Sequence, residues 1–426
     1  MAEASSKRVL VIAHYFPPLA MGGVQRIAKF CKYLPDYGWE PLVIASAPEN
    51  YFAFDTSMDR ELRWVRVFRA GSPVPVGAGT GESFNTWRRR LKAFAGWFLV
   101  PDARVLWSPS ALLLGLKVLT RFKVDCILAT APPYSSLLVA RLLAARTGLP
   151  LAVDLRDAWV DDPFAYYPTP LHRALAVKLE KYVTSGSAKV ISINQRIIDG
   201  LRRRHDLGAA RYAVVNQGFD PEDFEQVVER SEKFTICYAG SLLRNRRPDD
   251  LFRAVSELIE EKEVERMSLE VDIVGFSPPV FKMLAEDLGI SDVVQFRGYL
   301  PHSESVRHLM RADLLWLYVA ESEGETVLTG KLPEYIGSGK MVAASVPGRG
   351  AAASLVRDTG AGEVVQPGDV DGLKSVLLSA YSRWVSGEKL GGASREVRKY
   401  DRRCLAGVLA GILTEISGSD RPSRPR

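Results

Sequence analysis

The chain has 426 residues, of which 47% are hydrophobic and 25% are charged, with a formal net charge of +6. Such a length exceeds one hydrophobic core and predicts two domains of roughly 200 residues. With no uninterrupted apolar run of ~18 residues the sequence predicts no membrane-spanning helix. The basic excess favours nucleotides, phosphates or an anionic lipid surface as partners, and no nucleic-acid-binding motif is present.

The first residues and the cysteines indicate the compartment. The segment MAEASSKRVLVIAHYF lacks the long apolar region and cleavage site of a secretory signal. The four cysteines lie far apart, without the spacing of a metal site or a disulfide framework. We therefore expect a cytoplasmic protein with reduced thiols.

The first half of the chain alternates between apolar runs and helical patterns. KRVLVIAHYF predicts a buried strand, and it is followed by a helix with Ile27, Phe30 and Leu34 on one face and by the strand PLVIAS. VDCILAT, SLLVARLLAART, PLAVDL, a helix around residues 171–185 and AKVISIN continue the pattern. This alternation is typical of a parallel sheet covered by helices.

A second series of the same kind begins at FTICYAG, residues 234–240, and ends at GEVVQPGD. The predicted fold class is therefore α/β, with two Rossmann-like doubly wound parallel-sheet domains facing a cleft, where such folds bind ligands. We expect one domain over residues 1–220 and the other over 221–395. Residues 417–426 are poor in apolar residues and are predicted to be disordered.

Gly22 and Gly23 follow the first strand after a short loop and open a helix. Paired glycines let the backbone approach a ligand, and free N–H groups at a helix start attract anions. The alternative is a simple strand-to-helix turn. The spacing is not that of a dinucleotide-binding fingerprint.

Arg244, Arg246 and Arg247 follow the first strand of the second series, in GSLLRNRRPDD. Guanidinium groups bind phosphate oxygens in pairs and keep their charge at any working pH. The alternative is a solvated charge run, but the position at a strand end favours a phosphate site.

Lys331 and Glu334 lie three residues apart at the start of a predicted helix, after Thr329 and Gly330. An exposed salt bridge is the alternative, worth only ~0.3 kcal/mol. A cation beside backbone N–H groups instead suits a diphosphate, and a carboxylate one turn later suits a vicinal diol. Together these groups predict a nucleotide site.

DLRDAWVDD, residues 154–162, places Arg156 and Asp157 after a strand of the first domain. We interpret them as acceptor-side residues, with an ion pair that shapes the loop as the alternative. Asp369 and Asp371 fit a turn and helix N-cap better than a metal site. Because no second carboxylate cluster accompanies them, no essential metal is predicted.

An aromatic and basic pattern covers residues 84–98, FNTWRRRLKAFAGWF. Its large apolar residues recur at steps of three and four, beside three arginines and a lysine. The pattern is typical of a helix that lies on an anionic membrane surface. A helix packed on its own domain is the alternative.

Five segments carry a resemblance to a known family: HYFPPLAMGGVQR, DLRDAW, VVNQGFDPEDF, YAGSLLRNRRP and KLPEYIGSGK. In this order the chain resembles the retaining glycosyltransferases of the GT-B fold, family four, over nearly its whole length. It is most similar to bacterial enzymes of surface polysaccharide or glycoconjugate biosynthesis. The resemblance implies a helix over residues 396–416 that crosses back to the first domain.

The resemblance also implies roles for the predicted residues. Lys331, with Arg246 or Arg247, would bind the diphosphate of a nucleotide sugar, and Glu334 would hold the ribose hydroxyls. Asp157 would lie near the sugar or the acceptor. Other donor contacts would come from backbone and loop residues, namely Gly22, Gly23, Gly275, Tyr299, Leu300, Thr329 and Gly330.

The expected activity is transfer of a sugar from a UDP- or GDP-sugar to an acceptor hydroxyl, with retention and without a cofactor. A glycan or lipid-linked acceptor at the inner membrane face is the expected partner. The chain departs from the common pattern at Thr326, Arg156 and Ser241. Two alternatives therefore stay open, a sugar-nucleotide epimerase of the same fold and an inactive scaffold subunit.

Overall fold

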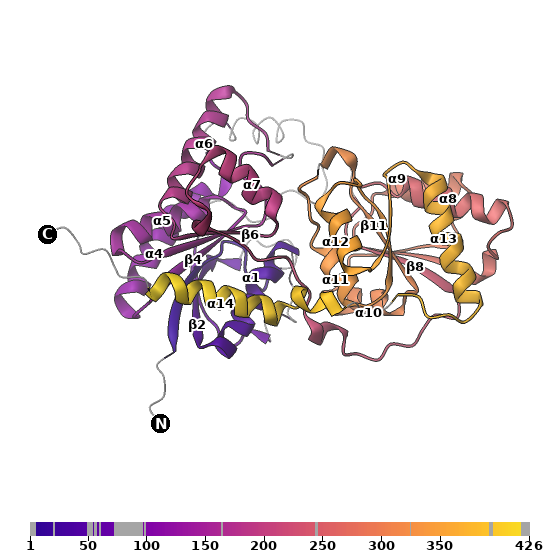
Figure 1. Cartoon of the computed structure of the whole chain (residues 1–426), viewed down its shortest axis with the longest axis horizontal. Helices are drawn as coiled ribbons and strands as arrows, with labels where there is room; N and C mark the ends of the chain where they lie inside the picture. Colours follow the sequence, from indigo (N-terminus) through magenta and orange to yellow (C-terminus); the bar gives the residue numbers. More distant parts are fainter. Residues whose placement is uncertain are drawn as a thin grey trace. The chain divides into compact units, whose positions relative to one another are not determined.

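The computed structural model describes residues 6–19, 22–48, 54, 58, 61–71, 97, 99–162, 165–242, 246–323, 325–391 and 395–418. The chain divides into two compact units (Figure 1). The first unit comprises Met1–Asn216 and Arg402–Arg426, and the second unit comprises Gln217–Asp401. The division falls after residues 216 and 401, whereas the sequence placed it after 220 and 395.

The first unit is a seven-stranded sheet of order β3-β2-β1-β4-β5-β6-β7, with every pair parallel. Its strands are β1 (Lys7–Ile12), β2 (Trp39–Ser46), β3 (Arg66–Ala70), β4 (Cys126–Ala131), β5 (Leu151–Leu155), β6 (Lys189–Ser192) and β7 (Tyr212–Val214). The helices are α1 (Gly22–Tyr33), α4 (Ser108–Arg121), α5 (Ser135–Thr147), α6 (Pro170–Ser185), α7 (Gln195–Arg204) and α14 (Arg402–Gly418). Continuous apolar runs such as β4 are buried because helices cover both faces of a parallel sheet.

The second unit is a six-stranded parallel sheet of order β10-β9-β8-β11-β12-β13. Its strands are β8 (Phe234–Ala239), β9 (Leu269–Val274), β10 (Val294–Gly298), β11 (Leu314–Tyr318), β12 (Met341–Ser345) and β13 (Gly362–Val365). The helices are α8 (Asp249–Glu260), α9 (Pro279–Asp287), α10 (His302–Arg311), α11 (Lys331–Gly337), α12 (Ala351–Thr359) and α13 (Val370–Val385). In both sheets the order of the strands reverses beside the first strand, since the chain adds strands on one side of it and then on the other. This order confirms two Rossmann-like doubly wound units.

The last helix belongs to the first unit. α14 packs on α1, and its buried Leu409 and Leu413 join the core that contains Ile27 and Cys31. α14 begins at Arg402, later than predicted, because residues 395–400 form a separate 3-10 helix. Residues 417 and 418 are helical, so the predicted disorder is wrong there. Within this last turn the hydroxyl of Ser417 donates a hydrogen bond to the carbonyl of Thr414.

Some predictions fall on other parts of the chain. Residues 419–426 lie outside the described residues, and so does the aromatic and basic segment apart from Trp97. Across the described ranges, no helix is both long and apolar enough to cross a membrane. The N-cap prediction is confirmed, since Asp369 accepts a hydrogen bond from the backbone N–H of Gly372 at 2.9 Å and begins α13.

A buried ion pair ties three elements of the first unit together. Nη2 of Arg26 on α1 lies 2.8 Å from Oδ1 of Asp154 on β5, and both side chains are almost fully buried. Arg26 also donates to the carbonyls of Val215 and Asn216 beyond β7, and Thr130 donates to Asp154. Each charge is therefore compensated inside the unit.

Asp154→Ala should lower the free energy of unfolding of the first unit by about 3–5 kcal/mol, because it leaves Arg26 buried without its charge partner. Urea denaturation monitored by circular dichroism measures the loss. Asp36→Ala is the matched control: it removes the half-exposed pair with Arg403 and should cost less than about 1 kcal/mol. Equal losses in the two variants would contradict the assignment.

Candidate functional site

Two glycines shape the carboxyl edge of the second sheet. Gly240 and Gly275 follow β8 and β9 with φ of +134° and +127°, which favour glycine. A Cβ on Gly275 would lie 2.5 Å from the carbonyl carbon of Gly240, and a Cβ on Gly240 would lie 2.0 Å from Cε of Lys331. The close approach of the two loops and of the lysine therefore requires both glycines.

Lys331 is the first residue of α11 and folds back over the end of β8. Its Nζ donates a hydrogen bond to the hydroxyl of Tyr238 at 2.6 Å and lies 3.9 Å from the centre of that ring. Burial and the nearby charge of Arg246 lower the pKa of Lys331 well below its ordinary value, although Glu323 and Glu334 oppose the shift. An anionic ligand would relieve this unfavourable environment.

Arg246 is held by a buried carboxylate. Its Nε and Nη2 donate to the two oxygens of Glu323 at 3.0 and 3.2 Å, and the side chain of Glu323 is fully buried. Burial disfavours the charge of Arg246, but the hydrogen bonds and the charge of Glu323 outweigh it and raise the pKa of Arg246. The pair therefore fixes the orientation of a permanent cation close to Lys331.

The neighbouring arginine behaves differently. Arg247 makes two hydrogen bonds of 2.9 Å with Asp249 at the start of α8, and its side chain is half exposed. Of the two arginines predicted for one role, the structure brings only Arg246 into the electrostatic environment of Lys331. Arg244 lies outside the described residues.

α11 is anchored beneath the site by an aromatic side chain. The hydroxyl of the buried Tyr335 accepts a hydrogen bond from the backbone N–H of Ala239 at 2.8 Å. Because α11 has seven residues, its aligned backbone dipoles are few, and side chains supply most of the positive charge. Glu334 lies half-buried one turn after Lys331.

Thr329 and the loop after β10 complete this edge. The Thr329 hydroxyl is buried and has no hydrogen-bond partner in the described part of the chain, which is costly unless a ligand supplies one. The N–H of Gly275 donates to the carbonyl of Gly298 at 2.7 Å, which places the following Tyr299 beside the glycines. Tyr299 is 58% exposed, whereas Leu300 packs against the core.

In the first unit, Gly22 and Gly23 begin α1, and a neighbouring side chain already uses the space at Gly23. Nη1 of Arg156 would lie 2.6 Å from a Cβ at Gly23 and donates to its carbonyl. The buried Arg156 also donates to the carbonyls of Ala131 and Pro132. Arg156 is therefore fixed by backbone, and the exposed Asp157 follows it at the carboxyl end of β5.

Two residues of this arrangement were not predicted from the sequence. Glu323 is one of three alternating glutamates in a polar stretch, with nothing to mark it as buried. Tyr238 lies at a strand end, where an aromatic residue is ordinary. Among the described residues, no group of three or more His, Cys, Asp or Glu could hold a metal ion.

Comparison with known proteins gives the family. Residues 21–218 match the family described as "Glycosyl transferase 4-like domain", and residues 219–397 match "Glycosyl transferases group 1". The chain belongs to the group 1 glycosyltransferases of the GT-B, family four type. The predicted family is thus confirmed, and the junction of the two matches lies close to the boundary between the two units.

Curated relatives in this family match over part of their length. The chain is 27% identical to a D-inositol 3-phosphate glycosyltransferase of Streptomyces avermitilis, covering 30% of this chain and 31% of that protein. It is 26% identical to a protein of the same name from Streptomyces scabiei, covering 56% of each. The chain thus spans between about a third and just over half of these relatives.

Solved structures match over the whole fold at low identity. HepE of Anabaena in complex with UDP and glucose superposes with a TM-score of 0.64 at 16% identity, covering 96% of this chain and 100% of that one. Sucrose-phosphate synthase of Thermosynechococcus elongatus superposes with a TM-score of 0.69 at 15% identity, covering 97% and 100%. At these identities the likeness confirms the GT-B fold alone.

Glu323→Gln should lower the free energy of unfolding of the second unit by about 1.5–3 kcal/mol, because Arg246 loses charge-assisted hydrogen bonds in a partly buried site. Chemical denaturation measures the change. Asp249→Asn is the control, since it disturbs the exposed pair with Arg247 and should cost less than about 1 kcal/mol. A Glu323→Gln variant as stable as the wild type would show that the buried pair does not hold the site together.

Proposed function

We propose that the protein transfers a sugar from a UDP- or GDP-sugar to an acceptor hydroxyl, with retention of the anomeric configuration. The observation that carries this proposal is the convergence of Arg246 and Lys331 at the carboxyl edge of the second sheet. We further propose a role in cell-surface polysaccharide or glycoconjugate biosynthesis, in the cytoplasm or at the inner membrane face.

The two cations suit a leaving diphosphate. Arg246 offers a planar, oriented guanidinium, and Lys331 offers a single compact charge. As the glycosidic bond breaks, negative charge grows on the diphosphate oxygens. Cations fixed before the reaction stabilise this transition state more than the ground state. Glu323 acts here through Arg246, as a positioning residue.

The neighbouring residues suit the rest of a nucleotide sugar. Glu334 would accept hydrogen bonds from the ribose hydroxyls, and Tyr299 would stack beside the nucleobase. The buried Thr329 hydroxyl has a polar partner to gain from the ligand. In the first unit, Gly22, Gly23 and Asp157 are the candidates for contacts to the sugar or the acceptor.

A same-face transfer explains why these roles include no protein nucleophile. The acceptor hydroxyl would attack from the side that the diphosphate leaves, and a departing phosphate oxygen would receive its proton. The cations at Arg246 and Lys331 make this step easier by stabilising the phosphate as it separates. We propose that the reaction needs no essential metal and no cofactor beyond the donor itself.

An epimerase is the second candidate. A putative UDP-N-acetylglucosamine 2-epimerase of Listeria monocytogenes shares the fold, with a TM-score of 0.54 at 13% identity. NMR of the protein with a panel of UDP- and GDP-sugars separates the two activities. A transferase releases the nucleoside diphosphate and forms an α- or β-linked product only when an acceptor is present. A new sugar nucleotide formed without an acceptor would instead establish the epimerase.

Lys331→Ala should weaken UDP or GDP binding and lower the transfer rate a few hundredfold, because the loss of one preorganised cation raises the activation barrier by ~3 kcal/mol. Calorimetric titration with each nucleotide and a turnover assay measure the two effects. Arg247→Ala is the matched control. Because the guanidinium of Arg247 pairs with Asp249, its removal should leave nucleotide binding nearly unchanged. If the Arg247 variant loses affinity and the Lys331 variant keeps it, the clamp is assigned wrongly.

Diphosphate binding should take up a proton at pH values between the pKa of Lys331 in the free protein and its pKa in the complex. In the free protein the pKa of Lys331 is lowered, mainly by burial, and a bound anion raises it again. Between these two pKa values, binding adds a proton, and affinity falls as the pH rises. Titrations in buffers of different ionisation enthalpy count the proton. Lys331→Met should abolish the proton uptake. An unchanged uptake in that variant would show that the proton does not bind to Lys331.

A further inference from the structure

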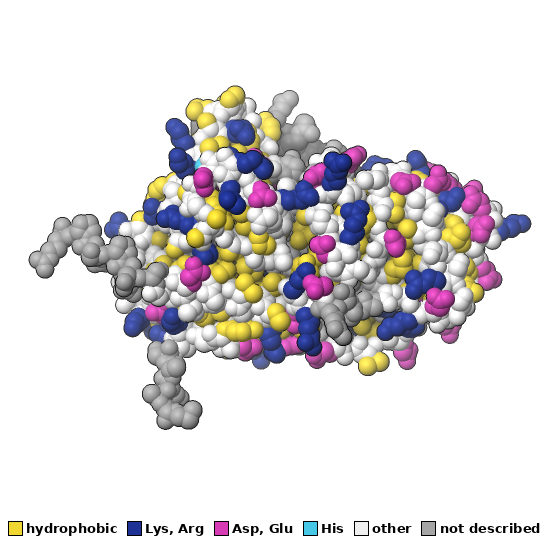
Figure 2. All heavy atoms as spheres, in the orientation of Figure 1, with side chains coloured by type: hydrophobic (Ala, Val, Ile, Leu, Met, Phe, Trp, Pro, Cys, Tyr) yellow, Lys and Arg dark blue, Asp and Glu magenta, His cyan; other side chains and the backbone are white. Residues whose placement is uncertain are grey.

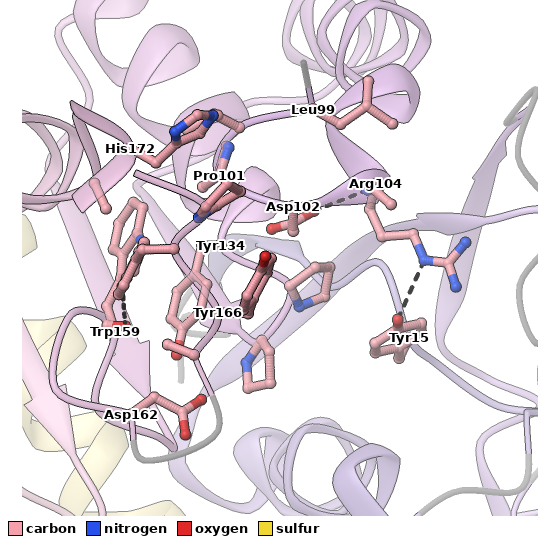
Figure 3. Close-up of a pocket in the computed structure, with 18 residues that line it drawn as sticks. Tyr15, Leu99, Pro101, Asp102, Arg104, Tyr134, Trp159, Asp162, Tyr166 and His172 are labelled. Carbon is pink, nitrogen blue, oxygen red and sulfur yellow. Dashed lines mark hydrogen bonds between the residues drawn. The ribbon is translucent and has the colours of Figure 1, made fainter. Parts of the chain in front are cut away.

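The first unit contains a cavity of about 380 Å³ that the donor site does not explain (Figure 3). It lies at the carboxyl edge of the sheet, where Tyr15 follows β1, Tyr134 follows β4 and Trp159 follows β5. Residues 99–104 and α6 form the other walls. This volume is within the range of small-molecule pockets, about 300–1,000 Å³.

The walls of this cavity are largely aromatic and apolar. Tyr134 and Trp159 stack face to face, with ring centres 4.6 Å apart and an angle of 9° between the planes. Tyr166, which is 77% exposed, also lines the cavity. The remaining apolar lining comes from Leu99, Val100, Pro101, Ala103, Pro132, Pro133, Ala165, Pro168 and Ala176.

Many polar groups of the lining are already bound within the unit. The Asp102 carboxylate accepts the backbone N–H groups of Arg104 and Ser135, each at 2.9 Å. Tyr134 donates its hydroxyl hydrogen to the carbonyl of Ala158. Both ring nitrogens of His172 have partners, Thr169 and the carbonyl of Trp97. A sugar ring needs several hydrogen bonds to replace water, so this lining favours a hydrocarbon over a sugar.

α6 connects the cavity to an apolar and basic surface. His172 and Ala176 line the cavity, whereas Leu171, Leu175 and Tyr182 are 75%, 40% and 41% exposed. Positions 171, 175, 178 and 182 recur at helical spacing, and the exposed cations on this helix are Arg173, Lys178 and Lys181. Over α6, hydrophobic side chains lie beside lysines and arginines (Figure 2). Such a surface is complementary to an anionic lipid layer.

We propose that this cavity binds the hydrocarbon chain of a lipid acceptor whose head group carries a phosphate. The chain would lie between Tyr166 and the stacked Tyr134–Trp159 pair, and the guanidinium of Arg104 would face the phosphate. Arg104 is already oriented in the cavity, since its Nε donates to the hydroxyl of Tyr15 at 3.3 Å. That the bound lipid is the acceptor rests on the proposed transferase function, whereas the binding itself does not.

Calorimetric titration of the full chain with hexyl, octyl and decyl phosphate, each below its micelle concentration, tests the binding. Affinity should rise about fourfold for each added methylene until the cavity is full. Inorganic phosphate and methyl glucoside should bind far more weakly. An affinity that does not depend on chain length, or a methyl glucoside that binds as well as decyl phosphate, would overturn the proposal.

Two variants place the chain in this cavity. Tyr166→Ala should weaken decyl phosphate binding about tenfold, and Arg104→Gln should remove the preference for decyl phosphate over decanol. Tyr182→Ala, on the outer part of the same helix, is the control and should bind like the wild type. If only the Tyr182 variant loses affinity, the chain binds the outer surface and the cavity assignment is wrong. A circular dichroism spectrum and a urea unfolding transition like those of the wild type show that the first unit of each variant is folded.

A comparison of decyl phosphate with geranyl phosphate then identifies the type of chain, saturated or isoprenoid, by the tighter ligand. Transfer assays with the tighter lipid separate this inference from the proposed function. Lipid binding without sugar transfer from any donor would leave the cavity assigned and the transferase proposal refuted. Transfer to water-soluble glycans alone, with no lipid binding, would support the transferase proposal and refute the assignment of the cavity.

Discussion

Lys331 and Arg246 are two cations held near each other at one edge of a parallel sheet. Their mutual repulsion, together with the burial of Lys331, is the constraint on which the site of the second unit depends. The protein compensates it incompletely. Glu323 neutralises Arg246 from inside the core, whereas Lys331 donates a hydrogen bond to the hydroxyl of Tyr238 and lies over the ring of that residue. The pKa of Lys331 is lowered first by burial and then by the charge of Arg246, so both effects disfavour the charged lysine in the free site. An anion at this edge would recover that energy, which links the stability of the site to its ligand.

Backbone geometry makes the arrangement possible. Gly275 lets the end of β9 pass against Gly240, and Gly240 in turn leaves room for the folded-back side chain of Lys331. Tyr335, one helical turn after Lys331, anchors α11 to the end of β8. Lys331 is therefore positioned by a strand end and a short helix, and Arg246, in the loop before α8, is positioned by the buried Glu323. This rigidity is what electrostatic stabilisation of a transition state requires, because charges that must reorganise lose much of their effect.

The sequence predicted the elements well because their signals are local. Apolar runs such as the one in β4 and the helical spacing in α1 specify buried strands and an amphipathic helix without reference to the rest of the chain. The ends of α14 were less predictable. A separate 3-10 helix precedes its start, and its last turn contains Ser417 and Gly418, which are not strong helix formers. Such boundaries depend on details that a periodic pattern does not carry.

The site was predicted only in part, for the same reason. Lys331 and Arg246 could be proposed because cations after strand ends are recognisable. The choice between Arg246 and Arg247 could not be made, because it depends on Glu323, a carboxylate 77 positions away that only the folded chain brings to Arg246. The burial of Glu323 is a tertiary property of a polar segment. Likewise, the partner of Gly23 proved to be Arg156, a residue that lies 133 positions later in the chain.

A crystal structure with a bound nucleoside diphosphate would test the central claim most directly. The account predicts phosphate oxygens within hydrogen-bond distance of Lys331 Nζ and of the Arg246 guanidinium, with Glu323 still paired to Arg246. Lys331 would then exchange the hydroxyl of Tyr238 for phosphate. A diphosphate bound elsewhere, with Lys331 still hydrogen-bonded to Tyr238, would contradict it.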